Sequence, residues 1–320
     1  MRTFMRLIAV AVPLVLASQA LAQGYPNRSV KMVVPFGAGG PADVYARVLA
    51  KHLSDETKQS FVVENRPGAG AVIGTDAVAK ATPDGYTLLV MSNTQTTNES
   101  LIPNKPYELM RDLIPVATIN YSDLLMVVHP SVEAKTVAEF IALAKKDPGK
   151  LNYASSGPGT PYHMAGELFK AMSKSDVVHI PHKASGDARN SVLSGNVQMM
   201  FDAVTTMTEL AKGGKVRAIA TTGLKRNPLT PDLPTVAETV PGYEATIWLG
   251  VMAPKGTPGD VVTYLNKAIN KVIELPEVKE AWLKQGAIPL VKTPAEFDAY
   301  LRKDIEKWSG VVKVSGASVK

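Results

Sequence analysis

Two glycine-rich segments carry the residues that could bind a small anion. The first, PFGAGGPAD at 35–43, follows the apolar run 30–35 and opens a segment with helical spacing at 41–53. Glycines allow a sharp turn and a close backbone approach, and Pro41 suits the first position of a helix. The free N–H groups and the dipole of such a helix start can hold an anion without a cationic side chain. Asp43, in the first helical turn, is expected to complement that dipole.

The second segment, YASSGPGTPYH at 153–163, also follows an expected strand and opens an expected helix. Its hydroxyl groups, on Ser155, Ser156 and Thr160, add donors to the backbone N–H groups. Turn and N-cap chemistry alone would explain one such segment. Two of them, on separate strand–helix units, favour a cleft between two lobes, in which one carboxylate held by both segments would draw the lobes together.

The first segment also fits a different chemistry. GAGGPA at 37–42 matches the dinucleotide fingerprint G-x-G-x-x-G/A, and Glu64 stands about where a ribose-binding acid would be. A Rossmann-type oxidoreductase is therefore an alternative. Pro41 argues against it, because proline removes one of the N–H groups that a pyrophosphate would use.

The second segment raises the alternative of a serine hydrolase. Ser155 or Ser156 would be the nucleophile, and His163 and Asp202 would complete the triad. The nucleophile elbow G-x-S-x-G is absent, and His163 is expected to cap its helix or to orient the serine segment. The chain has no cysteine, and its five histidines lack metal-site spacing. We therefore expect no enzyme activity, no cofactor and no metal.

The N-terminus predicts export. Arg2 and Arg6 precede the apolar run 7–16, and Ala-Leu-Ala at 20–22 is the pattern that a signal peptidase cuts. The apolar run is shorter than the roughly 20 residues of a membrane-spanning helix. Residues 1–22 are therefore expected to be a cleaved signal peptide, which places the mature protein in the periplasm. Nicotinamide cofactors are scarce there, which also disfavours a dehydrogenase.

Composition and periodicity indicate a globular α/β protein. The formal net charge of +6 is a mild basic excess without the dense patch of a nucleic-acid partner. Strand-like and helix-like segments alternate from residue 30 to residue 309, which predicts a parallel sheet with helices on both faces. No Pro/Gly-rich linker divides the chain, as expected if it crosses between two lobes more than once.

Ordered motifs along nearly all of the mature chain resemble a known family. The motifs of the first part are YPNR at 25–28, PFGAGGPAD at 35–43, ENRPGAGAVIG at 64–74 and ATPDGYTLL at 81–89. Those of the second part are SSGPGTPYHMAGELF at 155–169, QMMFD at 198–202, LPTVAETVPGYE at 233–244 and WLGVMAPKGTP at 248–258. Together they resemble the Bug-type, TctC-like substrate-binding receptors of tripartite tricarboxylate transporters.

The resemblance implies a type II periplasmic-binding-protein fold: two α/β lobes with a ligand cleft between them. The crossings are expected near 119–125 and 245–250, with the first lobe at 23–122 plus 248–320 and the second at 123–247. In this family a ligand carboxylate is held largely through backbone groups and water. Carried over to this sequence, the ligand-binding residues are Phe36, Gly37, Ala38, Gly39 and Gly40, then Ser155, Ser156, Gly159, Thr160 and Asp202, with Asn93 and Thr94 for the far end of the ligand.

The resemblance also implies a function and partners. The expected function is a periplasmic solute-binding receptor that captures a small carboxylate, such as a di- or tricarboxylate or an aromatic acid, and docks transiently as a monomer on membrane transporter subunits. A carboxylate sensor that feeds a signalling partner is the alternative. Two departures from the family pattern are His182-Lys183, where Tyr-Lys is common, and Thr239, where glycine is common. Lys183 could pair with a second carboxylate or with Asp202, or face solvent.

Overall fold

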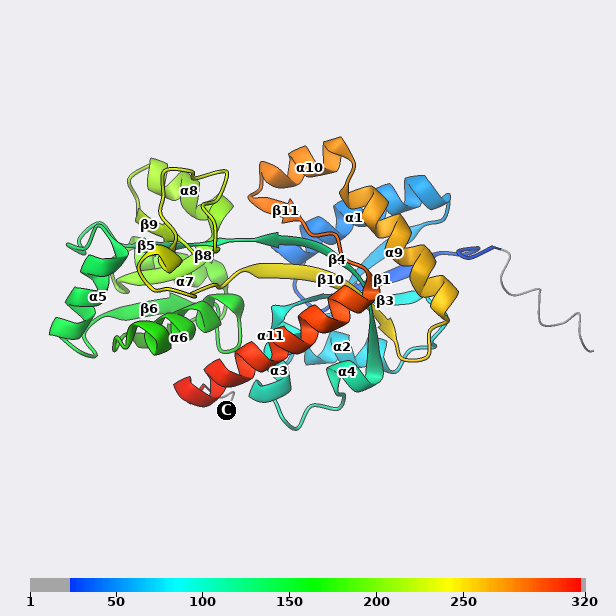
Figure 1. Cartoon of the computed structure of the whole chain (residues 1–320), viewed down its shortest axis with the longest axis horizontal. Coiled ribbons are helices and arrows are strands. Elements are labelled where there is room, and N and C mark those ends of the chain that lie inside the picture. The colour runs from blue at the N-terminus through cyan, green and yellow to red at the C-terminus, as the bar shows by residue number, and fades with distance from the viewer. Residues whose placement is uncertain (1–23, 318–320) are drawn as a thin grey trace, which may run out of the picture.

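Two β-sheets form the framework of the protein in the computed structural model, which describes residues 24–317. The expected signal peptide, residues 1–22, lies outside the described residues. Within residues 24–317, no helix is long and apolar enough to cross a membrane. Figure 1 shows the sheets in two separate halves of the molecule, which we call lobe 1 and lobe 2.

Lobe 1 is built on a six-stranded sheet in the order β11-β4-β10-β3-β1-β2. Its strands are β1 (Val30–Val34), β2 (Phe61–Asn65), β3 (Thr87–Ser92), β4 (Leu113–Ser122), β10 (Ile247–Pro254) and β11 (Ala287–Pro289). Its helices are α1 (Pro41–Thr57), α2 (Val72–Ala79), α3 (Asn93–Leu101), α4 (Leu109–Asp112), α9 (Gly259–Ile273), α10 (Pro276–Leu283) and α11 (Pro294–Ser315). Buried apolar side chains of β1, β3 and β10 form its core with α1 and α9.

Lobe 2 is built on a five-stranded sheet in the order β7-β6-β8-β5-β9. Its strands are β5 (Leu124–Val128), β6 (Asn152–Ser155), β7 (Val178–Pro181), β8 (Met199–Ala203) and β9 (Arg217–Thr221). Its helices are α5 (Val137–Lys146), α6 (Pro161–Ser173), α7 (Ser185–Leu193) and α8 (Val204–Lys212), with a 3₁₀ turn η1 at Val236–Glu238. Phe140, Phe169 and Phe201 are among the side chains that fill its core.

The expectation of purely parallel sheets is wrong in part. Strands β2, β1 and β3 are parallel neighbours, as are β7, β6 and β8. The strands that carry the chain between the lobes, β4 and β10, pair antiparallel with each other, and β5 is antiparallel to both of its neighbours. The antiparallel pairs arise because β5 and β10 enter their sheets directly from the other lobe, whereas βαβ units give parallel neighbours.

The two lobes are joined where β4 and β10 lie side by side. Strand β4 ends at Ser122 and β5 begins at Leu124, so Asp123 alone separates the two sheets along the chain. Ile247 of β10 pairs with Ser122 at the same point. Asp123 is buried, and its carboxylate accepts a hydrogen bond from Asn227 Nδ2 at 2.9 Å. Burial raises the pKa of Asp123.

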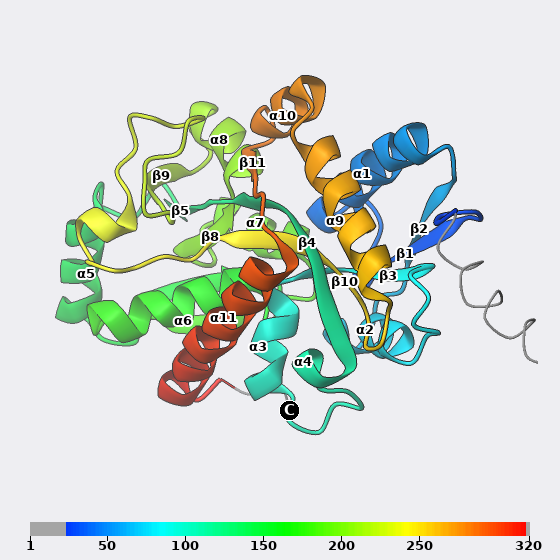
Figure 2. The ribbon, with the colours of Figure 1, turned by 45° about the vertical axis from the view of Figure 1, so that its right-hand side comes forward.

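The last helix, α11, packs against both lobes. It lies beside α3 of lobe 1 and α6 of lobe 2 (Figures 1 and 2). Phe297 and Leu301 belong to a core cluster of lobe 1, and Trp308 belongs to the core of lobe 2. Asp304 of α11 is buried between them and accepts a hydrogen bond from Thr96 Oγ1 at 2.6 Å. The helix therefore spans the back of the junction.

Asp304→Asn is expected to change how stability depends on pH. Burial raises the pKa of Asp304 to about 6, so the native state binds this proton more tightly than the unfolded chain does. The contribution of Asp304 to the free energy of unfolding should therefore fall as pH rises from about 4 to about 6, by up to about 3 kcal/mol, and stay level above that. Denaturant unfolding of both proteins between pH 4 and 7.5 measures this. The Asn variant should lose this fall, and parallel curves for the two proteins would contradict the assignment.

Candidate functional site

A cavity of about 220 Å³ lies between the lobes and takes lining residues from both of them. It sits where strands of both sheets end, which is where open α/β sheets bind ligands. Its wall is formed by Phe36, Gly40, Pro41, Ala42, Tyr45, Ser92, Thr94, Asn120, Ser122, Ser156, Thr160, Pro161, Tyr162, Ser185, Ala203, Ile247, Leu249 and Gln285.

Five helices begin at this cavity. The first residues of α1 and α6, Pro41 and Pro161, line it from opposite lobes, and residues at the starts of α3, α7 and α8 line it as well. The first turn of a helix has N–H groups without an intrahelical partner, and the helix dipole places about half a positive charge there. The cavity is therefore suited to an anion.

The described part of the cavity wall has no ionised side chain. Among the described residues that line it there is no Asp, Glu, Lys, Arg or His. Hydroxyl and amide groups supply the polar part of the wall, and Phe36, Tyr45 and Leu249 contribute apolar surface. A bound anion would thus be neutralised by helix starts and hydrogen bonds, while a carbon skeleton could rest on the apolar part.

Side chains behind the first glycine loop hold it in place. Asp43 Oδ2 accepts the Gly39 N–H at 2.9 Å and also the Arg47 Nε–H at 3.0 Å. Arg47 lowers the pKa of Asp43. Asn65 Nδ2 donates to the Phe36 carbonyl at 3.1 Å. Asp43 therefore lies in the first turn of α1, as expected, and its carboxylate also accepts a hydrogen bond from the loop.

The five residues expected to bind from this loop are not equivalent. Phe36 and Gly40 line the cavity, whereas Gly37, Ala38 and Gly39 are exposed and outside the wall. As ligand contacts all five stay predictions. Glu64, the acid of the dinucleotide alternative, forms ion pairs with Lys31 at 2.7 Å and Arg66 at 2.6 Å.

The serine loop before α6 divides in a similar way. Ser156 and Thr160 line the cavity, whereas Ser155 is fully buried behind it. Ser155 Oγ lies 2.6 Å from His179 Nε2. The Gly159 N–H donates to His163 Nδ1 at 3.1 Å. Both histidines are therefore engaged with the back of the loop.

Asp202 is a buried ion-pair partner behind the cavity. Arg189 Nε donates to its carboxylate at 2.5 Å, and the Ala203 N–H donates to it at 2.7 Å. Burial raises the pKa of Asp202, and the Arg189 guanidinium opposes that shift. The cavity is reached by the next residue, Ala203, rather than by Asp202 itself. Lys183, near this region in sequence, is exposed.

Asn93 and Thr94 lie in the first turn of α3. Thr94 lines the cavity, and Asn93 Nδ2 donates to the Thr246 carbonyl at 3.3 Å, just before β10. Ser92 and Gln95 form a reciprocal capping box at this helix start. The structure therefore brings Phe36, Gly40, Thr94, Ser156 and Thr160 together in one wall and leaves the other expected residues behind or outside it.

Sequence reasoning missed several residues of the wall. Asn120, Ser122, Ile247 and Leu249 lie on the crossing strands β4 and β10. These four residues lie within the expected crossings near 119–125 and 245–250. The crossings could have indicated them, because segments that join two lobes also line the space between the lobes. Gln285, in the turn before β11, had no such signal.

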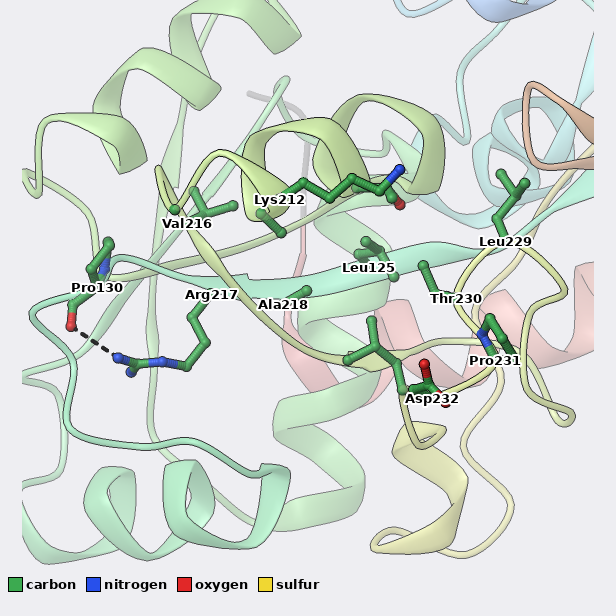
Figure 3. Close-up of a pocket in the computed structure, with 14 residues that line it drawn as sticks. Leu125, Pro130, Lys212, Val216, Arg217, Ala218, Leu229, Thr230, Pro231 and Asp232 are labelled. Atoms are coloured by element: carbon green, nitrogen blue, oxygen red, sulfur yellow. Dashed lines mark hydrogen bonds between the residues drawn. The ribbon is translucent and has the colours of Figure 1, made fainter.

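A larger hollow of about 530 Å³ belongs to lobe 2 alone. Figure 3 shows it between α8, β9 and the segment 229–233. Arg217 beside it donates to the carbonyls of Pro130 at 3.4 Å and Val132 at 2.7 Å, so its guanidinium is already engaged. Because no lobe 1 residue between 24 and 317 lines this hollow, a ligand in it would not connect the described parts of the lobes.

Comparison with known proteins assigns the family. The family model described as "Tripartite tricarboxylate transporter family receptor" matches residues 45–316. This chain belongs to that receptor family. It is 38% identical over 308 residues to "Protein BugT" of Bordetella pertussis, covering 95% of this chain and 94% of BugT.

Two solved structures are similar to this receptor over almost their whole length. One, "R. palustris Rpa4515 with adipate", has a TM-score of 0.83 and 33% identity, covering 92% of this chain and 99% of that one. The other, "periplasmic binding protein BugD", has a TM-score of 0.79 and 35% identity, covering 92% and 100%. The expected fold, two α/β lobes of the type II periplasmic-binding-protein class, is confirmed. Members of this family are periplasmic binding proteins, not enzymes.

Gly159→Ala is expected to destabilise this receptor. Gly159 has a φ of +76°, and a Cβ there would lie 2.4 Å from Leu101 Cδ2 of α3 in lobe 1. The left-handed backbone alone should cost about 1–2 kcal/mol, and the contact should hinder the approach of the lobes. Denaturant unfolding measures the stability.

Gly310→Ala is the matched control for this substitution. Gly310 is an exposed helical residue of α11, and a Cβ there would have nothing within 4 Å. It should gain about 0.5–1 kcal/mol, as glycine-to-alanine changes inside helices do. Equal effects of the two substitutions would contradict the role given to Gly159.

Proposed function

We propose that this receptor binds a small organic acid in the cavity between its lobes, with one carboxylate held between the starts of α1 and α6. The observation that carries the proposal is that Pro41 and Pro161, the first residues of these helices, line one cavity from opposite lobes. A carboxylate placed there gains hydrogen bonds from both lobes only when they are closed. The adipate bound to the R. palustris relative supports this ligand class.

The contacts to the ligand are proposed for the residues of the wall. Phe36, Gly40, Thr94, Ser156 and Thr160 would touch it. The remaining residues expected from the sequence would act by shaping the loops and helix starts: Gly37, Ala38, Gly39, Asn93, Ser155, Gly159 and Asp202. Support comes from the cavity lining and from the bonds that occupy Gly39, Ser155 and Asp202.

The body of the ligand should be largely apolar. The residues that the structure describes in the wall offer helix starts and hydroxyls but no cationic side chain, so each further carboxylate has to be satisfied by dipoles and hydrogen bonds. Monocarboxylates and dicarboxylates therefore fit the cavity better than tricarboxylates. Phe36, Tyr45 and Leu249 would contact the carbon skeleton.

The working cycle follows from export and closure. Residues 1–22 would be removed as a signal peptide, so that residues 23–320 fold in the periplasm. Lobe 1 would comprise residues 23–122 plus 248–320 and lobe 2 residues 123–247, consistent with the strand ends at Ser122 and Ile247. The closed monomer would dock transiently on the membrane subunits of its transporter.

A thermal-shift panel tests the proposed ligand class. Residues 23–320 would be mixed with adipate, malate, benzoate, glutamate and citrate, and with adipamide as an uncharged control of similar shape to adipate. A ligand at a thousand times its Kd should add about 4 kcal/mol of stability. Mono- or dicarboxylates should raise Tm most, citrate less and adipamide not at all. If no acid raises Tm, or if adipamide equals adipate, the proposed function is wrong.

A further inference from the structure

We propose that His163 and His179 are positioning residues of the carboxylate site: as neutral rings they accept the hydrogen bonds that keep the loop 155–160 in its binding conformation. The inference deepens the proposed function and rests on it. Neither ring lines the cavity. Both act on the ligand only through the loop in front of them.

His179 fixes the beginning of the loop through Ser155. The Gly157 N–H donates to Ser155 Oγ at 3.1 Å. Ser155 Oγ lies 2.6 Å from His179 Nε2, closer than the 3.3 Å to its other acceptor, the Gly157 carbonyl. The hydroxyl therefore accepts from Gly157 and donates to the ring. In this chain of bonds the Gly157 N–H donates within the loop rather than to a ligand, and Ser156 lies on the cavity side.

His163 fixes the end of the loop directly. Its Nδ1 accepts the Gly159 N–H at 3.1 Å. Thr160 Oγ1, which caps α6, donates to the Gly157 carbonyl at 2.7 Å. Gly157 and Gly159 both have positive φ, a backbone conformation that glycine adopts readily. The two rings thus select which donors of the loop face the cavity.

The surroundings keep both rings neutral. The centroids of the two rings are 4.1 Å apart and their planes are tilted by 31°, and Tyr153 stacks on His179 with centroids 4.8 Å apart. Burial lowers the pKa of His163 to about 4, helped by Lys170. Burial also lowers the pKa of His179 to about 3, with His163, Lys170 and His182 adding to the shift.

The charged groups around the rings belong to the elements packed on them. Glu167 of α6, which favours a proton on His179, accepts hydrogen bonds from Tyr153 Oη at 2.5 Å and from Lys170 Nζ at 2.9 Å. Its charge is therefore largely engaged. An imidazolium at either position would lose its acceptor nitrogen and turn a donor toward the loop.

The bonds predict opposite tautomers for the two rings. An acceptor at Nδ1 places the hydrogen of His163 on Nε2, and an acceptor at Nε2 places the hydrogen of His179 on Nδ1. Nitrogen-15 NMR of the ligand-free receptor should show these two tautomers and no imidazolium between pH 5.5 and 8. The opposite tautomers, or a charged ring in this range, would overturn the proposal. This readout needs no ligand, so it decides the inference even if the proposed function fails.

Paired substitutions test the effect on binding. His163→Asn keeps an acceptor, Oδ1, in the place of Nδ1, whereas His163→Leu removes it. Adipate binding measured by calorimetry should weaken about 10- to 100-fold in the Leu variant and by less than about threefold in the Asn variant. The control is His129→Leu, because His129 follows β5 at the end of the sheet away from the cavity. It should bind as the wild type does.

The outcomes separate this inference from the proposed function. A wild type that binds no acid of the panel contradicts the proposed function. A wild type that binds adipate while His163→Leu binds equally well, with only a lower Tm, shows a merely structural histidine and overturns the positioning role.

Affinity of the wild type for adipate should stay within about twofold from pH 8 to 5.5. A rise in affinity toward acid pH would indicate a cationic ring at the ligand and would also overturn it.

Discussion

The proposed binding site depends on one geometric constraint: the N-termini of helices from both lobes must meet at a single cavity. Strands β4 and β10 meet this constraint, because they run side by side between the lobes and leave only Asp123 between the two sheets on the β4 side. Each lobe then presents the carboxyl ends of its parallel strands, and the helices that follow them, to the same space. The described residues of the cavity wall include no ionised side chain. The proposed binding of an anion therefore depends on these helix N-termini and on hydrogen bonds.

The parts of the site that could be predicted are those with a local signature. Glycines followed by proline mark the starts of α1 and α6, and both helix starts line the cavity. Backbone groups make these sites, so a turn-and-helix pattern is enough to find them. The same local reasoning also predicts ligand contacts for Asp202 and Gly159, which are not among the residues that line the cavity. Their bonds to Arg189 and His163 join residues 13 and 4 positions apart, through side chains that a motif alone does not orient.

The parts that could not be predicted depend on tertiary context. Helix α3 has the sequence NTQTTNESL, and its residues Asn93 to Asn98 are all buried. No apolar periodicity in the sequence indicates this burial, which depends on distant polar contacts such as that of Thr96 with Asp304 of α11, 208 residues away. The crossing strands were expected as segments, but their antiparallel pairing and the wall residues on them follow only from the packing of two sheets. The contact between the rings of His163 and His179 likewise joins α6 to β7.

In the proposed binding mode, backbone donors of α1 and α6 together hold a carboxylate without a cationic side chain. A crystal structure of residues 23–320 in complex with a bound dicarboxylate tests it most directly. We expect one carboxylate between Gly40–Ala42 and Thr160–Tyr162, with its oxygens at about 2.7–3.2 Å from N–H or hydroxyl groups of both lobes. A carboxylate paired with Arg189, with Lys183 or with Arg217 in the lobe 2 hollow would contradict it.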